Sequence, residues 1–325
     1  MLPSHLDLDL DAVDLVRLAF VVAAGGVYLV FFTPAFRSRF LAYGARASSN
    51  ISSAEQEKRA SHKSGNAIET ALDQLATLEV PHSWFISFYA VSVCCSLICA
   101  ADYVLSGPVT TQFAALINSW RSSITFNQVV ITWIAVLAQG CRRLYECHAF
   151  SRPSKSTMWV GHWAIGLAFY VGLNIAIWIE GARALQKHKL TLIDLSIQTP
   201  SFRTFVTLAV FMFASGIQHD CHAYLASLKP TGANNKDGKT DYKLPNHPAF
   251  HLTLTPHYFA ECIIYLSLAG MAAPSGQWLN GTVSCALLFV AVNLGVTAHG
   301  TYDWYRQKFG KESLRGRWRM VPFVF

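Results

Sequence analysis

The feature that most constrains this chain is a series of stretches of about twenty mostly apolar residues. A helix of that length matches the hydrocarbon thickness of a bilayer, and it satisfies its own backbone hydrogen bonds in lipid. Strand-like alternation and internal repeats are absent from the sequence. We therefore expect an all-α membrane protein with seven transmembrane helices, at about residues 13–35, 83–105, 125–147, 157–179, 203–227, 254–273 and 281–306.

Composition agrees with this class. Of the 325 residues, 52% are hydrophobic and only 14% are charged, whereas a soluble domain usually has about 25% charged residues. The net charge of +7 comes from basic residues in particular loops and near the C-terminus, and this is not the pattern of a nucleic-acid footprint. The eight cysteines lie in or beside apolar segments without a CxxC pair, as expected of small buried hydrophobes rather than a disulfide framework.

Lysine and arginine in short loops predict the orientation in the membrane. Four basic regions fall on one side of a seven-span protein: 36–82, 148–156, 229–251 and the tail after 306. The other side has the acidic N-terminus and the loops 106–124 and 274–280, in which Arg121 is the one basic residue; loop 180–202, with three, is the exception. We expect one integral domain, 1–325, in the endoplasmic reticulum membrane, with the N-terminus in the lumen and the C-terminus in the cytosol.

Polar side chains gather at the cytosolic ends of the predicted third, fifth, sixth and seventh helices. In that order they are Gln139, Arg142, Arg143, Tyr145 and Glu146; Gln218, His219, Asp220, His222 and Tyr224; His257, Tyr258 and Glu261; and Asn293, His299, Tyr302 and Tyr305. Ionisable groups within a membrane usually face a bundle interior or a wet cavity. The pairs Gln218/His222 and His257/Glu261 are four residues apart, so each shares one helix face. We expect the seven helices to enclose a cavity that opens to the cytosol.

Two kinds of ligand suit such a cavity. A metal ion could use the HDCH stretch at 219–222 with His257 and Glu261, but HExxH and other histidine-rich boxes are missing, so we expect no metal. A large anionic cofactor fits better, because basic groups at the mouth suit phosphates and inner amides and carboxylates suit ribose and carboxamide groups. Without GxGxxG or a Walker loop, the site would differ from a Rossmann site. Taken alone, each of these polar residues can be explained by a hydrogen bond between helices, without any contact with a ligand.

Several motifs in this order resemble those of the steroid 5α-reductase family, most of all its polyprenol (polyprenal) reductase branch. They are QGCRRLYEC (139–147), QHDCHAYLASLK (218–229), YKLP (242–245), PHYFAECIIY (256–265), WYRQKF (304–309) and VPFVF (321–325). The first half matches more loosely, through EVP (79–81) and FISFYAVSV (85–93). The resemblance divides the chain into N-terminal helices, 1–138, with a substrate-side glutamate, and a reductase core, 139–325.

The resemblance implies NADPH as cofactor and assigns residues to it. The implied cofactor-binding positions are Gln218, His222, Lys229, Tyr242, Lys243, His257, Glu261, His299 and Tyr305. Glu79 matches a glutamate that hydrogen-bonds the substrate carbonyl, and His257 stands where relatives have asparagine. Gly140 replaces a substrate-facing tyrosine of the steroid enzymes, which leaves Gln139 or Tyr145 as candidates to take over. Either His299 or Tyr302 takes the place of a family histidine.

The implied reaction is the NADPH-dependent reduction of the α-isoprene double bond of a polyprenol-type lipid. Hydride can add to the β-carbon only when a carbonyl is conjugated with the alkene, so the aldehyde is the expected reacting form. The enolate then needs a hydrogen-bond donor, for which Glu79 is the first candidate and Tyr145 the second. The substrate would be a long-chain isoprenoid in contact with membrane lipids, and the product would support dolichol-dependent protein N-glycosylation. The alternatives are a 3-oxo-Δ4 steroid or long-chain enoyl reductase of the same superfamily, and a non-enzymatic lipid-binding membrane protein.

Overall fold

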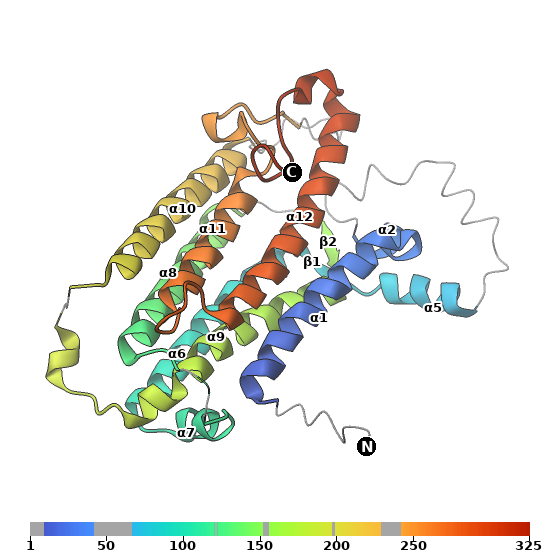
Figure 1. Cartoon of the computed structure of the whole chain (residues 1–325). Coiled ribbons are helices and arrows are strands. Elements are labelled where there is room, and N and C mark those ends of the chain that lie inside the picture. Colours follow the sequence, from blue (N-terminus) through green and yellow to red (C-terminus); the bar gives the residue numbers. More distant parts are fainter. Residues whose placement is uncertain are drawn as a thin grey trace, which may run out of the picture.

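The computed structural model describes residues 10–41, 67–119, 121, 123–151, 156–196, 199–228 and 242–325. Long helices run side by side, and each predicted span corresponds to one of them (Figure 1). These helices are α1 (Ala12–Phe32), α6 (Ile86–Val104), α8 (Phe126–Ala149), α9 (Val160–Lys187), α10 (Phe202–Ser227), α11 (Pro256–Met271) and α12 (Gly281–Phe309). We call the end of the bundle where α12 finishes the upper end, and the end where α1 begins the lower end, as they lie in Figure 1.

Short elements close the two ends of the bundle. The short helices are α2 (Pro34–Phe40), α5 (Ala67–Ala76) and α7 (Pro108–Ala115), and the 3-10 turns are His82–Phe85, Leu192–Leu195, Pro248–Phe250 and Glu312–Leu314. Two three-residue strands, β1 (Glu79–Pro81) and β2 (Thr157–Trp159), pair antiparallel, with Glu79 opposite Trp159. The described part of the chain is otherwise mostly helical, as the all-α class predicts, and the sequence does not show this ribbon because a strand of three residues is too short to display a two-residue alternation.

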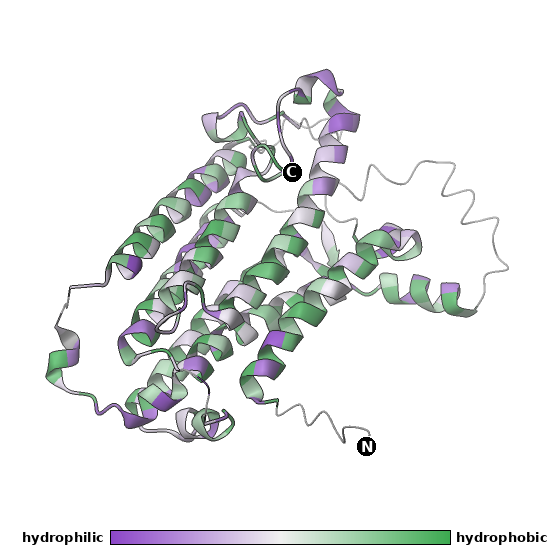
Figure 2. Cartoon of the chain, in the orientation of Figure 1, coloured by the Kyte–Doolittle hydropathy of each residue, from purple (hydrophilic) through white to green (hydrophobic). Residues whose placement is uncertain are grey.

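Four helical segments are long and apolar enough to cross a membrane, judged by length and composition. They are Ala12–Phe32, His82–Val104, Val160–Lys187 and Gly281–Phe309, and Figure 2 shows hydrophobic residues along most of the bundle's length. The helix α11 has only 16 residues, while α8 and α10 each carry polar residues in their last turns. The structure thus supports a helical membrane protein, and the crossing of the membrane by α8, α10 and α11 stays a prediction.

A cluster of charges at the lower end ties the start of α1 to the segment after α7. Asp11 caps α1 by accepting hydrogen bonds from the Val13 and Asp14 amides, and it also accepts from the Asn118 amide at 3.1 Å and from Arg121 Nε at 2.7 Å. Burial opposes ionisation of Asp11, but these hydrogen bonds outweigh it and hold the pKa of the carboxyl below its ordinary value. These contacts place Asp11 and Arg121 at the same end of the bundle, as the loop charges predict.

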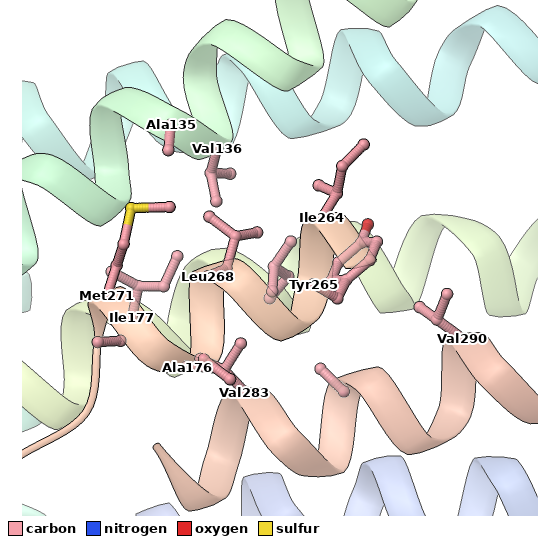
Figure 3. Close-up of a cluster of buried hydrophobic side chains, with 14 of the residues drawn as sticks. Ala135, Val136, Ala176, Ile177, Ile264, Tyr265, Leu268, Met271, Val283 and Val290 are labelled. Atoms are coloured by element: carbon pink, nitrogen blue, oxygen red, sulfur yellow. The ribbon is translucent and has the colours of Figure 1, made fainter. Parts of the chain in front are cut away.

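The apolar core is centred on α11, which lies among α8, α9 and α12 (Figure 3). Its side chains Ile264, Leu268 and Met271 are at most 1% exposed. Gly270 lets α11 approach α10 closely, because a Cβ at this position would lie 2.6 Å from Thr207 Cγ2. Much of this central helix is therefore buried inside the protein, and its upper end, where His257 and Glu261 lie, is held by its neighbours.

A second buried charge joins three helices at the lower end. Arg17 of α1 donates to Glu180 Oε1 of α9 at 3.0 Å and to Thr282 Oγ1 of α12 at 2.8 Å, and Thr282 donates to the same carboxylate. The Glu180 side chain is only 2% exposed. A buried carboxylate is tolerated only when it is paired and hydrogen-bonded, so this contact fixes how α1 sits against α9 and α12.

Close packing of α9 against α8 depends on Gly181. A Cβ at this position would lie 2.1 Å from Val129 Cγ2, and Val129 is fully buried with a stiff, branched side chain. We expect Gly181→Ala to lower the unfolding free energy by about 1–3 kcal/mol through overpacking. The matched control is Gly216→Ala in α10, where nothing lies within 4 Å of the new Cβ. Thermal unfolding in detergent measures both variants, and equal midpoints for the two would contradict the predicted clash.

Candidate functional site

The candidate site is a cluster of polar side chains at the upper end, built around the carboxylate of Glu146 on α8. The Glu146 side chain is 1% exposed. It pairs with Arg142 and Arg143, four and three residues earlier on the same helix. It also lies 2.8 Å from His219 Nδ1 and 2.8 Å from His222 Nδ1 of α10. Spacings of three and four place residues on one helix face, so one carboxylate holds two helices together.

The ring of His222 is oriented by this carboxylate. Its Nδ1 lies 2.8 Å from Glu146 Oε2 and 2.6 Å from Arg143 Nη1, and Arg143 Nη1 also donates to Oε2. A guanidinium can only donate and a carboxylate can only accept, so Nδ1 of His222 cannot bond to both groups. Because Arg143 Nη1 already donates to Oε2, we assign the hydrogen to Nδ1, which then donates to the same oxygen. Nε2 is then left as an acceptor for a further partner. The ring itself meets His257 of α11 edge to face, with centroids 5.4 Å apart.

Arg143 extends the cluster to α6. Its Nε and Nη2 donate to the Tyr89 hydroxyl at 3.1 and 2.8 Å, while Nη1 is bonded to Glu146. The fork of an arginine can serve two partners in fixed directions, which lysine cannot do. Tyr89 is 5% exposed and has no place among the residues singled out in the sequence. It lies in an aromatic stretch, FISFYAV, where the sequence offers no signal that separates it from core residues.

Side-chain amides link the charged cluster to α11. Gln218 donates from Nε2 to Glu261 Oε2, and Gln139 Nε2 lies 3.2 Å from Gln218 Oε1 and 3.4 Å from Glu261 Oε2. Arg142 joins the two groups because its Nη2 donates to Gln139 Oε1 at 2.8 Å and to Gln218 Oε1. The residues predicted on the third, fifth and sixth helices, Gln139, Gln218, His222, His257 and Glu261, therefore do come together.

Two buried polar atoms in this cluster have no hydrogen-bond partner. They are Nδ1 of His257 and Nε of Arg142. An unsatisfied buried donor or acceptor costs about 1–3 kcal/mol, and such groups are rare in folded proteins. A polar ligand that reached both atoms would remove this cost, so the cluster is chemically suited to a ligand with donors and acceptors of its own.

The remaining predicted cofactor residues lie in a second group at the upper end. The Tyr242 ring meets Trp304 edge to face at 5.0 Å, and Lys308 Nζ lies 4.8 Å over the same ring. Lys243 is exposed, and Tyr305 packs on Phe309 with ring centroids 5.8 Å apart. Lys229, which the resemblance also assigns to the cofactor, lies outside the described residues.

The choice between His299 and Tyr302 is not decided by contacts with the cluster. His299 pairs with Asp303 on its own helix at 3.2 Å, and its ring meets Phe31 of α1 edge to face. The Tyr302 ring lies 4.9 Å from the Arg319 guanidinium carbon. Both residues thus face neighbouring segments of the upper end, and the position of the family histidine stays open between them.

The two catalytic candidates are not joined to the polar cluster. Glu79 is exposed on β1, and its carboxylate accepts a hydrogen bond from Thr157 Oγ1 at 2.5 Å. It therefore lies at the surface and not in apolar surroundings. Tyr145 is 61% exposed and lies between Arg143 and Glu146 in sequence but on a different face of α8. At Gly140, where a family tyrosine is missing, α8 packs directly on α6, since a Cβ would lie 3.1 Å from Val93 Cγ2 and 3.4 Å from Ser92 Oγ.

The C-terminal segment braces the start of α11. Residues 252–254 and 318 exchange backbone hydrogen bonds of 2.8 Å in a parallel bridge, and Thr255 Oγ1 donates to the Arg319 carbonyl at 2.7 Å. A pocket of about 310 Å³ opens beside this segment; it is lined by Tyr302, Gly316, Arg317, Trp318, Arg319 and Phe325. Phe325 of the VPFVF motif lines this pocket, and a cavity enclosed by all seven helices stays a prediction.

Metal ligands do not converge in the described part of the chain. No group of three or more His, Cys, Asp or Glu side chains there has an arrangement that could hold a metal ion. His219 and His222 instead share Glu146 with two arginines. Guanidinium groups at this distance would repel a bound cation.

Comparison with known proteins first defines the class. The family model described as 3-oxo-5-alpha-steroid 4-dehydrogenase matches residues 184–325, which include α10, α11, α12 and the C-terminal segment. The motif on α8 lies before the matched region. The resemblance to the steroid 5α-reductase family that the motifs predict is therefore confirmed.

Within this class the chain is similar to polyprenal reductases. It is 27% identical over 272 residues to the polyprenal reductase of Drosophila melanogaster, covering 77% of this chain and 78% of the fly protein. It is 28% identical over 296 residues to polyprenal reductase 2 of Oryza sativa subsp. indica, covering 77% and 80% of the two chains. The polyprenal reductase of Xenopus tropicalis is 26% identical over 270 residues, covering 77% and 82%. The similarity covers 77% of the chain in each case, so it includes part of the N-terminal half.

Glu146 is the residue on which the stability of the polar cluster depends, because two arginines and two histidines share its carboxylate. Glu146→Gln removes the buried counter-charge of Arg142 and Arg143, and breaking a buried ion pair in this way costs about 3–5 kcal/mol. We expect the thermal unfolding midpoint in detergent to fall markedly, while Glu69→Gln on exposed helix α5 leaves it nearly unchanged. Equal midpoints for Glu146→Gln and the wild type would show that the carboxylate does not hold α8 and α10 together.

Proposed function

We propose that this protein reduces the α-isoprene double bond of polyprenal with NADPH, and so supports dolichol-dependent N-glycosylation. The observation that carries the proposal is the polar cluster of α8, α10 and α11, because its residues come from the same motifs that carry the resemblance. The names of similar proteins, polyprenal reductases of an insect, a plant and an amphibian, point to the same reaction. The family model's description adds a second candidate, a 3-oxo steroid as substrate.

The residues of the cluster fit a dinucleotide. When bound, NADPH supplies a hydride to the β-carbon of the conjugated aldehyde. The unpartnered Nδ1 of His257, the free Nε2 of His222 and the amides around Glu261 would bind its ribose and carboxamide groups. Lys243 and Lys308 would meet its phosphates, with Tyr242 and Tyr305 beside them. Lys229 and His299 complete the proposed set of cofactor-binding residues.

The chain's own residues must bind the lipid at an angle that leaves its tail in the membrane. An isoprenoid tail cannot leave the hydrocarbon region, so its head has to enter between helices. We place the upper end on the cytosolic side of the endoplasmic reticulum membrane, where a soluble dinucleotide is available, and the start of α1 on the lumenal side. The basic tail that begins at Arg306 supports this orientation.

Turnover by the purified protein tests the proposal. We expect NADPH to be consumed with polyprenal at a higher kcat/KM than with a 3-oxo-Δ4 steroid or a long-chain enoyl thioester, because the branch motifs favour the isoprenoid. The measurement is the loss of NADPH absorbance in nanodiscs, with mass spectrometry of the lipid product. Faster turnover of the steroid would favour the second candidate. A protein that binds no NADPH would instead be a lipid-binding protein without enzymatic activity.

The role proposed for Glu79 is tested separately. If Glu79 donates a hydrogen bond to the substrate carbonyl, Glu79→Ala should lower kcat by about 10²–10³, as does loss of one donor to a developing oxyanion. Thr157→Ala is the matched control, because it removes the side chain that, among the described residues, bonds the carboxylate, and it leaves Glu79 in place. If Glu79 acts only by holding the ribbon together, the two variants will have the same modest effect, and the catalytic role is lost.

A further inference from the structure

The hydroxyl of Tyr89 is held in an unusual way for a buried tyrosine. It accepts two hydrogen bonds from Arg143, at 3.1 and 2.8 Å. Among the hydrogen bonds of the described residues, none has this hydroxyl as the donor. A phenol can accept two hydrogen bonds and donate one, so the two acceptor positions are used by Arg143 and the hydrogen must point away from the guanidinium.

The surroundings of Tyr89 fix the direction of its ring. Phe85 and Tyr170 meet the ring edge-on, with centroids 5.9 and 5.4 Å away. Through Arg143 and Glu146, Tyr89 is joined to the polar cluster that also includes Glu261 of α11. The Tyr89 hydroxyl therefore lies beside the polar cluster, and among the hydrogen bonds of the described residues it only accepts.

The close packing of α6 on α8 explains why Tyr89 reaches this junction. Gly140 has no side chain, and it lies against Ser92 and Val93 of α6. Tyr89 is three and four residues before these two, so it shares their helix face one turn nearer the upper end. Arg143 is three residues after Gly140, again one turn nearer the upper end, and there the two side chains meet. A tyrosine at 140 would hold the helices apart, so its absence and the approach of Tyr89 are linked.

We propose that Tyr89 is the catalytic acid of the reduction, and that Arg143 is its positioning residue. This inference rests on the proposed function. After hydride has reached the β-carbon, the electron pair of the double bond lies on the α-carbon and the carbonyl oxygen. Transfer of the phenolic proton breaks the O–H bond of Tyr89 and forms the C–H bond at the α-carbon. The tyrosinate that remains is stabilised by the guanidinium of Arg143, and a proton from water then restores the phenol.

The test compares three tyrosine-to-phenylalanine variants of the whole protein in nanodiscs. For Tyr89→Phe we expect kcat with polyprenal to fall by about 10²–10⁴, the range of general acid catalysis. The KM for polyprenal, the Kd for NADPH measured by its fluorescence and the unfolding midpoint should stay within about twofold or a few degrees of the wild type. Tyr28→Phe, exposed on α1, and Tyr170→Phe, in contact with the Tyr89 ring, are the matched controls and should keep kcat.

Each outcome has a definite reading. Tyr89→Phe with wild-type kcat overturns the inference and leaves the proposed function intact, and so does an equal loss in Tyr170→Phe. A wild type that does not reduce polyprenal overturns both. Arg143→Lys is the second variant if Tyr89→Phe does not fold, since lysine keeps the charge beside Glu146 but cannot donate both bonds to Tyr89. An unchanged kcat in that variant also overturns the inference.

Discussion

The carboxylate of Glu146 is the constraint on which the upper half of the molecule depends. It is almost completely buried, and four nitrogen-bearing side chains from α8 and α10 meet it. A charge in such a place is tolerated only where its partners are fixed, so α8 and α10 cannot shift along each other without leaving it exposed or unpaired. The helix α10 in turn packs closely on α11 at Gly270 and Thr207. One ionic contact therefore fixes the relative height of three helices and, with it, the positions of Gln218, His257 and Glu261.

At the lower end, other buried carboxylates are likewise paired with basic and polar side chains. Glu180 is buried between Arg17 and Thr282, and Asp11 is held by Arg121 and three backbone amides. Between these two polar layers the core is apolar and closely packed around α11. Helices in lipid gain little from hydrophobic attraction to one another, so packing and interhelical hydrogen bonds have to supply the association. Paired charges at both ends of the bundle, with close apolar packing between the two ends, agree with this need for packing and interhelical hydrogen bonds.

Much of the helical architecture follows from hydropathy, and much of the site does not. Long apolar runs identify all seven long helices, because a helix in lipid has a strict length and composition. The same reasoning cannot find a ribbon of three-residue strands, nor can it show whether polar-ended α8 and α10 or short α11 cross the membrane. Within the site, the spacing of Gln218 with His222 and of His257 with Glu261 correctly predicts shared faces that point at the cluster. Spacing within one helix cannot give contacts between helices, so the pairing of Glu146 with His219 and His222 needed the structure.

At the level of Gly140 the resemblance and the packing draw attention to different residues. Because position 140 is a glycine, the resemblance leaves its sequence neighbours Gln139 and Tyr145 as candidates for the role of the family tyrosine. Yet Gln139 is engaged with Gln218 and Glu261, and Tyr145 is largely exposed. A side chain deleted from one helix leaves room for the facing helix, not for the next residue along. At this level the facing helix is α6, which packs directly on Gly140, and one turn nearer the upper end the Tyr89 hydroxyl of α6 accepts two hydrogen bonds from Arg143.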